Sequence, residues 1–144
     1  MKKYAIWSLF IFSVLWTGCV PDAEEVLEKN GIEMNGANEV PSNNATAVGS
    51  IDAKYNKATN VLTYSISWSG LSGNHKGISL YNGSTTTNGN VVKVVQSTGS
   101  PTNSLTETWT VPENLRSTVE SGGIYVNILS DQYPSGEIRG QISF

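Results

Sequence analysis

The segment Val61-Leu62-Thr63-Tyr64-Ser65-Ile66-Ser67-Trp68 alternates between large apolar side chains and hydroxyl side chains. Successive side chains of a β-strand point to opposite faces of a sheet, so the apolar residues from Leu62 to Trp68 share one face. The pattern predicts an antiparallel strand with one face in a hydrophobic core and the other toward water.

Other strands are expected on both sides of this one. Residues 45–55 alternate in the same way, and residues 56–60 have the composition of a hairpin connection between the two strands. Further strands are predicted between clusters of Gly, Asn, Ser and Pro, at residues 32–35, 77–81, 91–96, 105–111, 124–129 and 137–144. About eight short strands predict an all-β fold, an antiparallel β-sandwich or a barrel.

One short helical turn is expected after residue 111. Pro112 suits the first position of a helix, Leu115 and Val119 are four residues apart and share a face, and Gly122 can end the turn. We expect this turn to cap one end of the sandwich.

The composition argues against nucleic acid as a partner. Charged residues make up 15% of the chain, against roughly 25% in a typical soluble domain. The formal net charge is −3, and Lys and Arg do not cluster after residue 3. The chain therefore has no basic surface for a phosphate backbone.

The first residues have the pattern of an export signal. Met1-Lys2-Lys3 precedes the mostly apolar run 5–16, which is too short for a membrane-spanning helix. The run ends in Leu15-Trp16-Thr17-Gly18-Cys19, which resembles a bacterial lipobox, although Trp16 stands where Leu is usual. The resemblance implies a signal peptide at 1–18 and a lipidated Cys19 that anchors the protein to a membrane of the bacterial cell envelope. The outer membrane or cell surface is favoured over the free periplasm.

Two alternatives stay open here: a secretory peptide with an incidental cysteine, or an apolar terminus that belongs to the fold. Cys19 is the only cysteine, so the domain has no internal disulfide. Residues 19–30 are predicted to be an acidic, solvated tether, either a spacer or an export signal, with the folded domain at 31–144.

A series of short motifs resembles the CHRD domain, a repeat first named from chordin. The motifs occur in order at residues 35–41, 47–49, 69–71, 88–92, 123–127 and 134–142, and Gly136-Glu137-Ile138-Arg139-Gly140-Gln141-Ile142 is the most specific. The resemblance implies an immunoglobulin-like sandwich, related in outline to copper/zinc superoxide dismutase, in an extracellular protein of poorly defined role. The motif residues expected to be structural are Glu39, Pro41, Asn127, Gly136, Glu137, Arg139 and Gly140.

Metal and catalytic chemistry are not expected. Many CHRD domains carry a His-x-His-Gly motif and a further histidine, whereas His75 is the only histidine here and reads as a solvated loop residue. We therefore expect no metal, no cofactor and no catalytic residue, which leaves a metal-dependent oxidoreductase as the less favoured alternative. The carboxylates in residues 131–137 fit a tight turn better than a calcium loop.

Glu137 and Arg139 lie two apart on a strand, so they share a face opposite to Ile138, Gly140 and Ile142. We interpret them as a structural pair that joins neighbouring strands, with Glu39 as a candidate partner of Arg139.

The polar loop 82–90 is the candidate binding site, since loops of β-sandwiches often carry recognition. Its candidate contact residues are Tyr81, Asn82, Thr85, Thr86, Thr87, Asn88 and Asn90. Tyr81, Tyr125 and Tyr133, if exposed, would add an aromatic surface, whereas Trp68 and Trp109 are assigned to the core. We therefore expect a non-catalytic envelope lipoprotein with a binding or structural role, whose partner is an unknown glycan or protein and whose oligomeric state stays open.

Overall fold

The computed structural model describes residues 25–96 and 102–144. The predicted signal peptide and Cys19 lie outside these residues. The strands are β1 (Val26–Asn35), β2 (Val48–Asn56), β3 (Val61–Ser69), β4 (His75–Asn82), β5 (Asn90–Gln96), β6 (Ser104–Thr110), β7 (Ile124–Ser130) and β8 (Ile138–Ile142). The helices are the 3-10 turns η1 (Gly36–Asn38) and η2 (Glu113–Leu115) and the short helix α1 (Arg116–Glu120).

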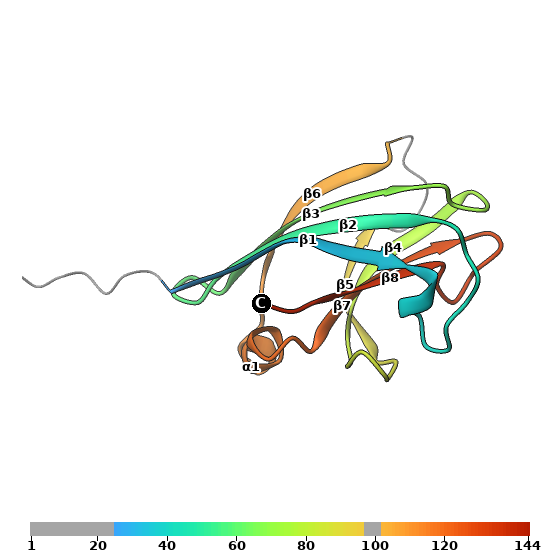
Figure 1. Cartoon of the computed structure of the whole chain (residues 1–144). Coiled ribbons are helices and arrows are strands. Elements are labelled where there is room, and N and C mark those ends of the chain that lie inside the picture. The colour runs from blue at the N-terminus through green and yellow to red at the C-terminus, as the bar shows by residue number, and fades with distance from the viewer. Residues whose placement is uncertain (1–24, 97–101) are drawn as a thin grey trace, which may run out of the picture.

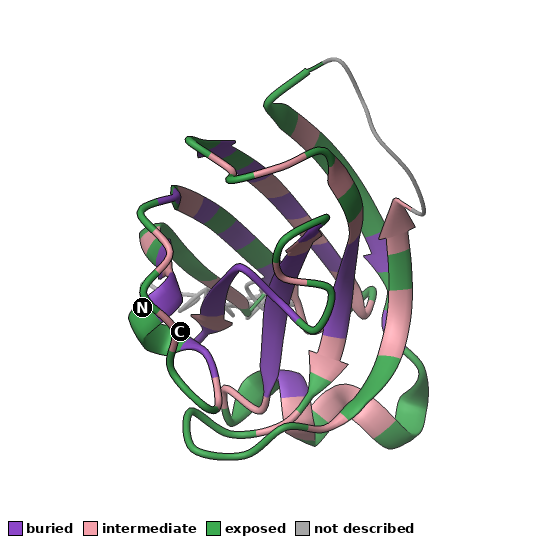
Figure 2. Cartoon of the chain, turned by 90° about the vertical axis from the view of Figure 1, so that its right-hand side faces the viewer, coloured by how far each residue is buried: buried purple, intermediate pink, exposed green. Residues whose placement is uncertain are grey.

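All eight strands belong to one antiparallel sheet in the order β5-β4-β7-β8-β1-β2-β3-β6. The sheet curves until it nearly closes into a barrel, and β5 and β6 are its two edges (Figures 1 and 2). The predicted all-β, eight-stranded antiparallel architecture is confirmed. The two layers expected of a sandwich are here two sides of one continuous sheet.

The interior of the barrel contains the apolar face predicted from β3. Leu62, Tyr64, Ile66 and Trp68 are between 0% and 6% exposed. Trp109 on β6 lies opposite Leu62 on β3 and is also buried, which confirms the core assignment of both tryptophans. Figure 2 shows the alternation of buried and exposed residues along the strands.

The predicted hairpin and helical turn are both present. Asn56 of β2 pairs with Val61 of β3 across the predicted connection. Pro112 directly precedes η2, and Val119 in α1 is fully buried. Gly122 has a positive φ of 75° just after the helix. The described residues include no helix that is long and apolar enough to cross a membrane.

Two expectations at the start of the chain and of β4 are corrected. The strand β1 begins at Val26, inside the predicted tether, and Val26 pairs with Asn56 of β2. Strand pairing uses the backbone, so the charged side chains of Glu28 and Lys29 remain exposed while the backbone joins the sheet. His75 belongs to β4 and stacks on Trp68, with ring centroids 5.6 Å apart, so it is not a solvated loop residue.

Candidate functional site

The strand β8 is buried on both faces. Ile138 and Ile142 point into the barrel and are 0% exposed, while Glu137 and Arg139 on the opposite face are 0% and 1% exposed. The predicted division of these residues between two faces is therefore correct. The polar face, however, lies beneath three loops that fold back over the outside of the sheet.

Arg139 fixes the β4–β5 loop, residues 83–89. Its Nη1 donates a hydrogen bond to Asn88 Oδ1 at 3.2 Å, and its Nη2 donates to the Thr87 carbonyl at 3.2 Å and to the Ser84 carbonyl. The guanidinium also stacks on Tyr125, 3.5 Å from the ring centroid. One buried cation thus determines the backbone conformation of the loop that the sequence indicates as a binding element.

Gln141 ties the same loop to the end of the helix. Its Nε2 donates hydrogen bonds to the carbonyls of Gly83 at 2.9 Å, Gly122 at 2.7 Å and Ile124 at 3.2 Å. The β4–β5 loop is therefore held at both of its ends by side chains from β8.

Glu137 secures the turn between β3 and β4. Its Oε1 accepts hydrogen bonds from the backbone N–H and the hydroxyl of Ser72, both at 2.8 Å. Asn43 Nδ2 donates to the carbonyls of Gly136 and Glu137 at 3.2 Å, which attaches the β1–β2 loop to the same place. The structural role predicted for Glu137 rests on these loop contacts.

Glu39 lies in the same buried cluster but does not pair directly with Arg139. In the part of the chain that the structure describes, no ion pair joins them, because the Arg139 donors bond to the β4–β5 loop and to Gln141. Glu39 is 7% exposed, and its Oε2 accepts a hydrogen bond from Asn127 Nδ2 at 3.2 Å. Burial raises the pKa of Glu39 to about 7, while the Arg139 charge and the Asn127 hydrogen bond act in the opposite direction.

The candidate loop residues lie as predicted, but the tyrosines do not form an aromatic surface. Exposed side chains of the loop and its flanks are Asn82, Thr85, Thr86, Thr87, Asn88 and Asn90. Tyr125 is only 2% exposed, between the Arg139 guanidinium and Tyr81, whose ring stacks on it at 5.0 Å. Tyr133 lies in the β7–β8 loop and lines a different hollow. The aromatic part of the predicted contact surface is therefore wrong.

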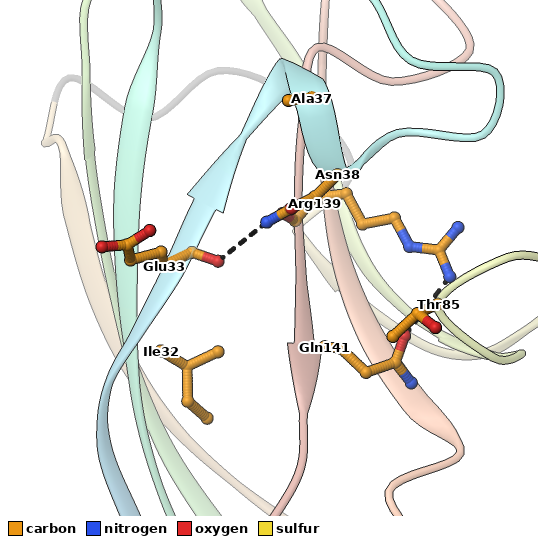
Figure 3. A pocket seen from close by; sticks show the side chains of 7 residues that line it. All are labelled: Ile32, Glu33, Ala37, Asn38, Thr85, Arg139 and Gln141. Carbon is orange, nitrogen blue, oxygen red and sulfur yellow. Dashed lines mark hydrogen bonds between the residues drawn. The ribbon is translucent and has the colours of Figure 1, made fainter.

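Three hollows adjoin the β4–β5 loop. The β1–β8 hollow, about 280 Å³, is lined by Ile32, Glu33, Ala37, Asn38, Thr85, Arg139 and Gln141. Figure 3 shows the Arg139 side chain reaching from β8 toward the loop segment that carries Thr85. Asn38 Nδ2 donates to the carbonyls of Glu33 and Arg139. The strongest donors of this hollow are thus engaged in internal hydrogen bonds.

The helix-side hollow is larger, about 690 Å³, and contains no charged residue. It is lined by Asn82, Gly83, Ser84, Thr85, Thr87, Thr118, Ser121, Gly122, Gly123, Gln141 and Ser143. The third hollow, about 450 Å³, lies between residues 39–43 and 132–136 and also contacts Asn88.

The carboxylates of the 131–137 turn have structural partners. Asp131 accepts a hydrogen bond from Asn74 Nδ2 at 2.8 Å and pairs with Lys76 at 2.6 Å, while Glu137 contacts Ser72, so the two carboxylates of the 131–137 turn have separate partners. Burial lowers the pKa of His75. Within residues 25–96 and 102–144, no three His, Cys, Asp or Glu side chains gather as a metal site.

The sequence did not identify Asn43, Ser72 and Gln141 as partners of the motif residues. Gln141 stands inside the most specific motif, and its position two residues after Arg139 was the available signal. Asn43 and Ser72 are 93 and 65 residues from the groups they contact, and nothing in their local sequence indicates those contacts.

Fold and site together define a small β-barrel-like domain in which polar side chains at β8 hold three loops on the outer face. The sequence pattern of the CHRD domain matches residues 31–142, and the chain belongs to the CHRD domain family. Neither a curated protein nor a solved structure matches the chain in the corresponding searches.

Proposed function

We propose that this chain is a non-catalytic lipoprotein of the bacterial cell envelope, and that its CHRD domain binds a neutral, hydroxyl-rich ligand such as a glycan. The observation that carries the binding proposal is the helix-side hollow. Every residue that lines it is Asn, Gln, Ser, Thr or Gly. The amide and hydroxyl groups can both donate and accept hydrogen bonds, as the hydroxyl groups of a sugar require.

The wall of this hollow is rigid where it is formed by the β4–β5 loop. Arg139 and Gln141 hold the carbonyls of Gly83, Ser84 and Thr87, so the exposed side chains are presented from a fixed backbone. A loop ordered before binding loses less conformational entropy when the ligand arrives. Preorganisation supports a binding role over a role as a flexible linker.

The lipid anchor is supported by the lipobox-like segment and by the start of the sheet. Residues 20–25 separate Cys19 from Val26, the first residue of β1. The seven residue steps from Cys19 to Val26 span at most about 25 Å. An acylated Cys19 would therefore keep the domain close to the membrane surface, where envelope glycans are accessible.

Removing hydroxyl groups from the hollow should weaken glycan binding. We expect the full-length protein to bind neutral glycans on an array, and the double variant Thr85→Ala/Ser143→Ala to bind the selected glycan roughly thirtyfold more weakly, because each of the two lost hydrogen bonds costs about 1 kcal/mol. Calorimetry with the selected glycan measures the difference. Thr86→Ala is the matched control, since Thr86 is exposed in the same loop but does not line the hollow. Equal affinity of wild type and double variant would place the binding site elsewhere.

Cys19 should carry the lipid. In bacteria grown with an alkyne-tagged fatty acid, we expect the wild-type chain to be labelled and to sediment with membranes, and Cys19→Ala to lose the label and the membrane association. Thr17→Ser is the control, because it keeps a small residue near the cysteine. Label that persists in Cys19→Ala would contradict the anchor.

A further inference from the structure

Among the described residues, three buried side-chain oxygens on the polar face of Glu137 and Arg139 have no hydrogen-bond donor: Glu137 Oε2, Glu39 Oε1 and Asn127 Oδ1. Glu39 and Asn127 are 7% and 4% exposed. A buried acceptor without a donor costs about 1–3 kcal/mol, and more when it carries charge. Glu39 Oε1 and Asn127 Oδ1 belong to two side chains that are hydrogen-bonded to each other, so their missing donors require an explanation.

Glu39 Oε1 and Asn127 Oδ1 both lie next to Gly136. Both stand close to the point that a Cβ atom on Gly136 would occupy, with Glu39 Oε1 at 2.7 Å and Asn127 Oδ1 at 2.6 Å from it. The other atoms of the same two groups already form a bond, from Asn127 Nδ2 to Glu39 Oε2 at 3.2 Å. The carboxyl and amide groups are thus joined by one hydrogen bond, with their other oxygens near the same point. In an edge-to-edge pairing of the two groups, a single proton between these oxygens would satisfy both.

We propose that Glu39 keeps its proton up to about neutral pH and that its carboxylic acid forms a reciprocal pair with the Asn127 amide. The acid O–H donates to Asn127 Oδ1, and the amide N–H donates to the other acid oxygen. Loss of this proton breaks one of the two bonds and places a negative charge beside a carbonyl oxygen. The pair is therefore a pH-sensitive hydrogen-bonded contact between the β1–β2 loop and β7.

The charged and titratable groups around Glu39 agree with this assignment. Arg139 on β8 favours the ionised form by its charge, but its donors are bonded to the β4–β5 loop and Gln141. Tyr81 on β4 and Tyr125 on β7 lie on the same face, and burial raises the pKa of Tyr81, so it stays neutral near pH 7. Glu137 Oε1 accepts hydrogen bonds from Ser72, while its Oε2 has no donor among the described residues.

Tyr133 lines the same hollow as Glu39. Of the causes that shift the pKa of Glu39, burial is the largest, and it raises the pKa to about 7.

The sign of the pH effect follows from linkage. The pKa of Glu39 is raised above the ordinary value of 4.5 that applies to the unfolded chain. Its contribution to stability is therefore fully present below about pH 4.5 and is lost as the pH rises through about 7. Above that pH, the contact between the β1–β2 loop and β7 should loosen.

Glu39→Gln removes the titratable proton but keeps the size and shape of the side chain. A glutamine can donate to Asn127 Oδ1 and accept from Asn127 Nδ2, so it retains both hydrogen bonds and cannot ionise. For the full-length protein, we expect the melting temperature of the wild type to fall by several degrees relative to Glu39→Gln between about pH 5 and about pH 9. Glu33→Gln is the matched control, because Glu33 is exposed on β1, and it should follow the wild type.

Carbon-13 NMR of the wild-type glutamate side chains tests the same proposal without a variant. We expect the Glu39 carboxyl resonance to titrate near pH 7. A Glu39 midpoint below about pH 5, where ordinary glutamates titrate, or the same pH profile of melting temperature in wild type and Glu39→Gln, would overturn the proposal.

Discussion

Arg139→Ala is expected to destabilise the domain by about 3–5 kcal/mol, because it removes a buried charge on which several groups depend. The carbonyls of Ser84 and Thr87 and the side chain of Asn88 would lose their donor, and Tyr125 would lose the cation above its ring. The truncation also leaves a cavity where a side chain only 1% exposed had packed. A loss of this size lowers the melting temperature by roughly 10–20 °C for a domain of this length.

Arg139→Ala should loosen the β4–β5 loop under conditions in which the rest of the domain is still folded. In hydrogen exchange measured by mass spectrometry below the melting temperature, the β4–β5 loop should lose protection in Arg139→Ala, while β2 and β3 on the far side of the sheet keep theirs. Arg139→Lys should lie between alanine and wild type, since an ammonium keeps the charge but cannot reproduce the fork of donors.

Arg116→Ala provides the control for loss of an arginine as such. Arg116 forms a bidentate contact with Glu113 and donates to the Lys57 carbonyl, but its side chain is 33% exposed. Its removal should therefore lower the melting temperature much less than Arg139→Ala does. Equal melting temperatures of Arg139→Ala and wild type would show that the loop does not depend on the buried cation.

The periodic parts of the fold could be predicted from the sequence because each carries its own signal. The alternation in β3 identified the core face, and the Pro112 to Gly122 segment identified the helical turn. The faces of β8 were also predicted correctly, since alternation depends only on backbone geometry.

What alternation could not indicate is that the polar face of β8 is buried. A polar residue on the outer face of a strand is predicted to contact water, and only the return of distant loops makes the face of Glu137 and Arg139 an interior. The same covering buries Tyr125, which alternation places on the outer face. Likewise, β1 pairs with β2 through its backbone. The charged side chains near Val26 show no apolar alternation from which this strand could be predicted.

Gly136→Ala tests the cluster from its centre. Gly136 has φ of 140°, a conformation that L residues rarely adopt. A methyl group there would stand 2.4 Å from Asn127 Nδ2 and 2.7 Å from Glu39 Oε1, too close for any side-chain atom. Backbone strain of about 1–3 kcal/mol and overpacking of a similar size should combine to lower the melting temperature by roughly 10 °C or more.

Gly31→Ala separates these two causes. Gly31 also has a positive φ, 69°, but a Cβ added there meets no atom within 4 Å. It should therefore show only the backbone strain, about 1–2 kcal/mol, measured by thermal unfolding beside Gly136→Ala. The excess cost of Gly136→Ala then reports the contact with the Glu39–Asn127 pair together with the greater backbone strain at a φ of 140°. If the two alanine variants melt together, the glycine in the motif is required for its backbone conformation alone, and close packing of the acid and amide against residue 136 does not contribute to stability.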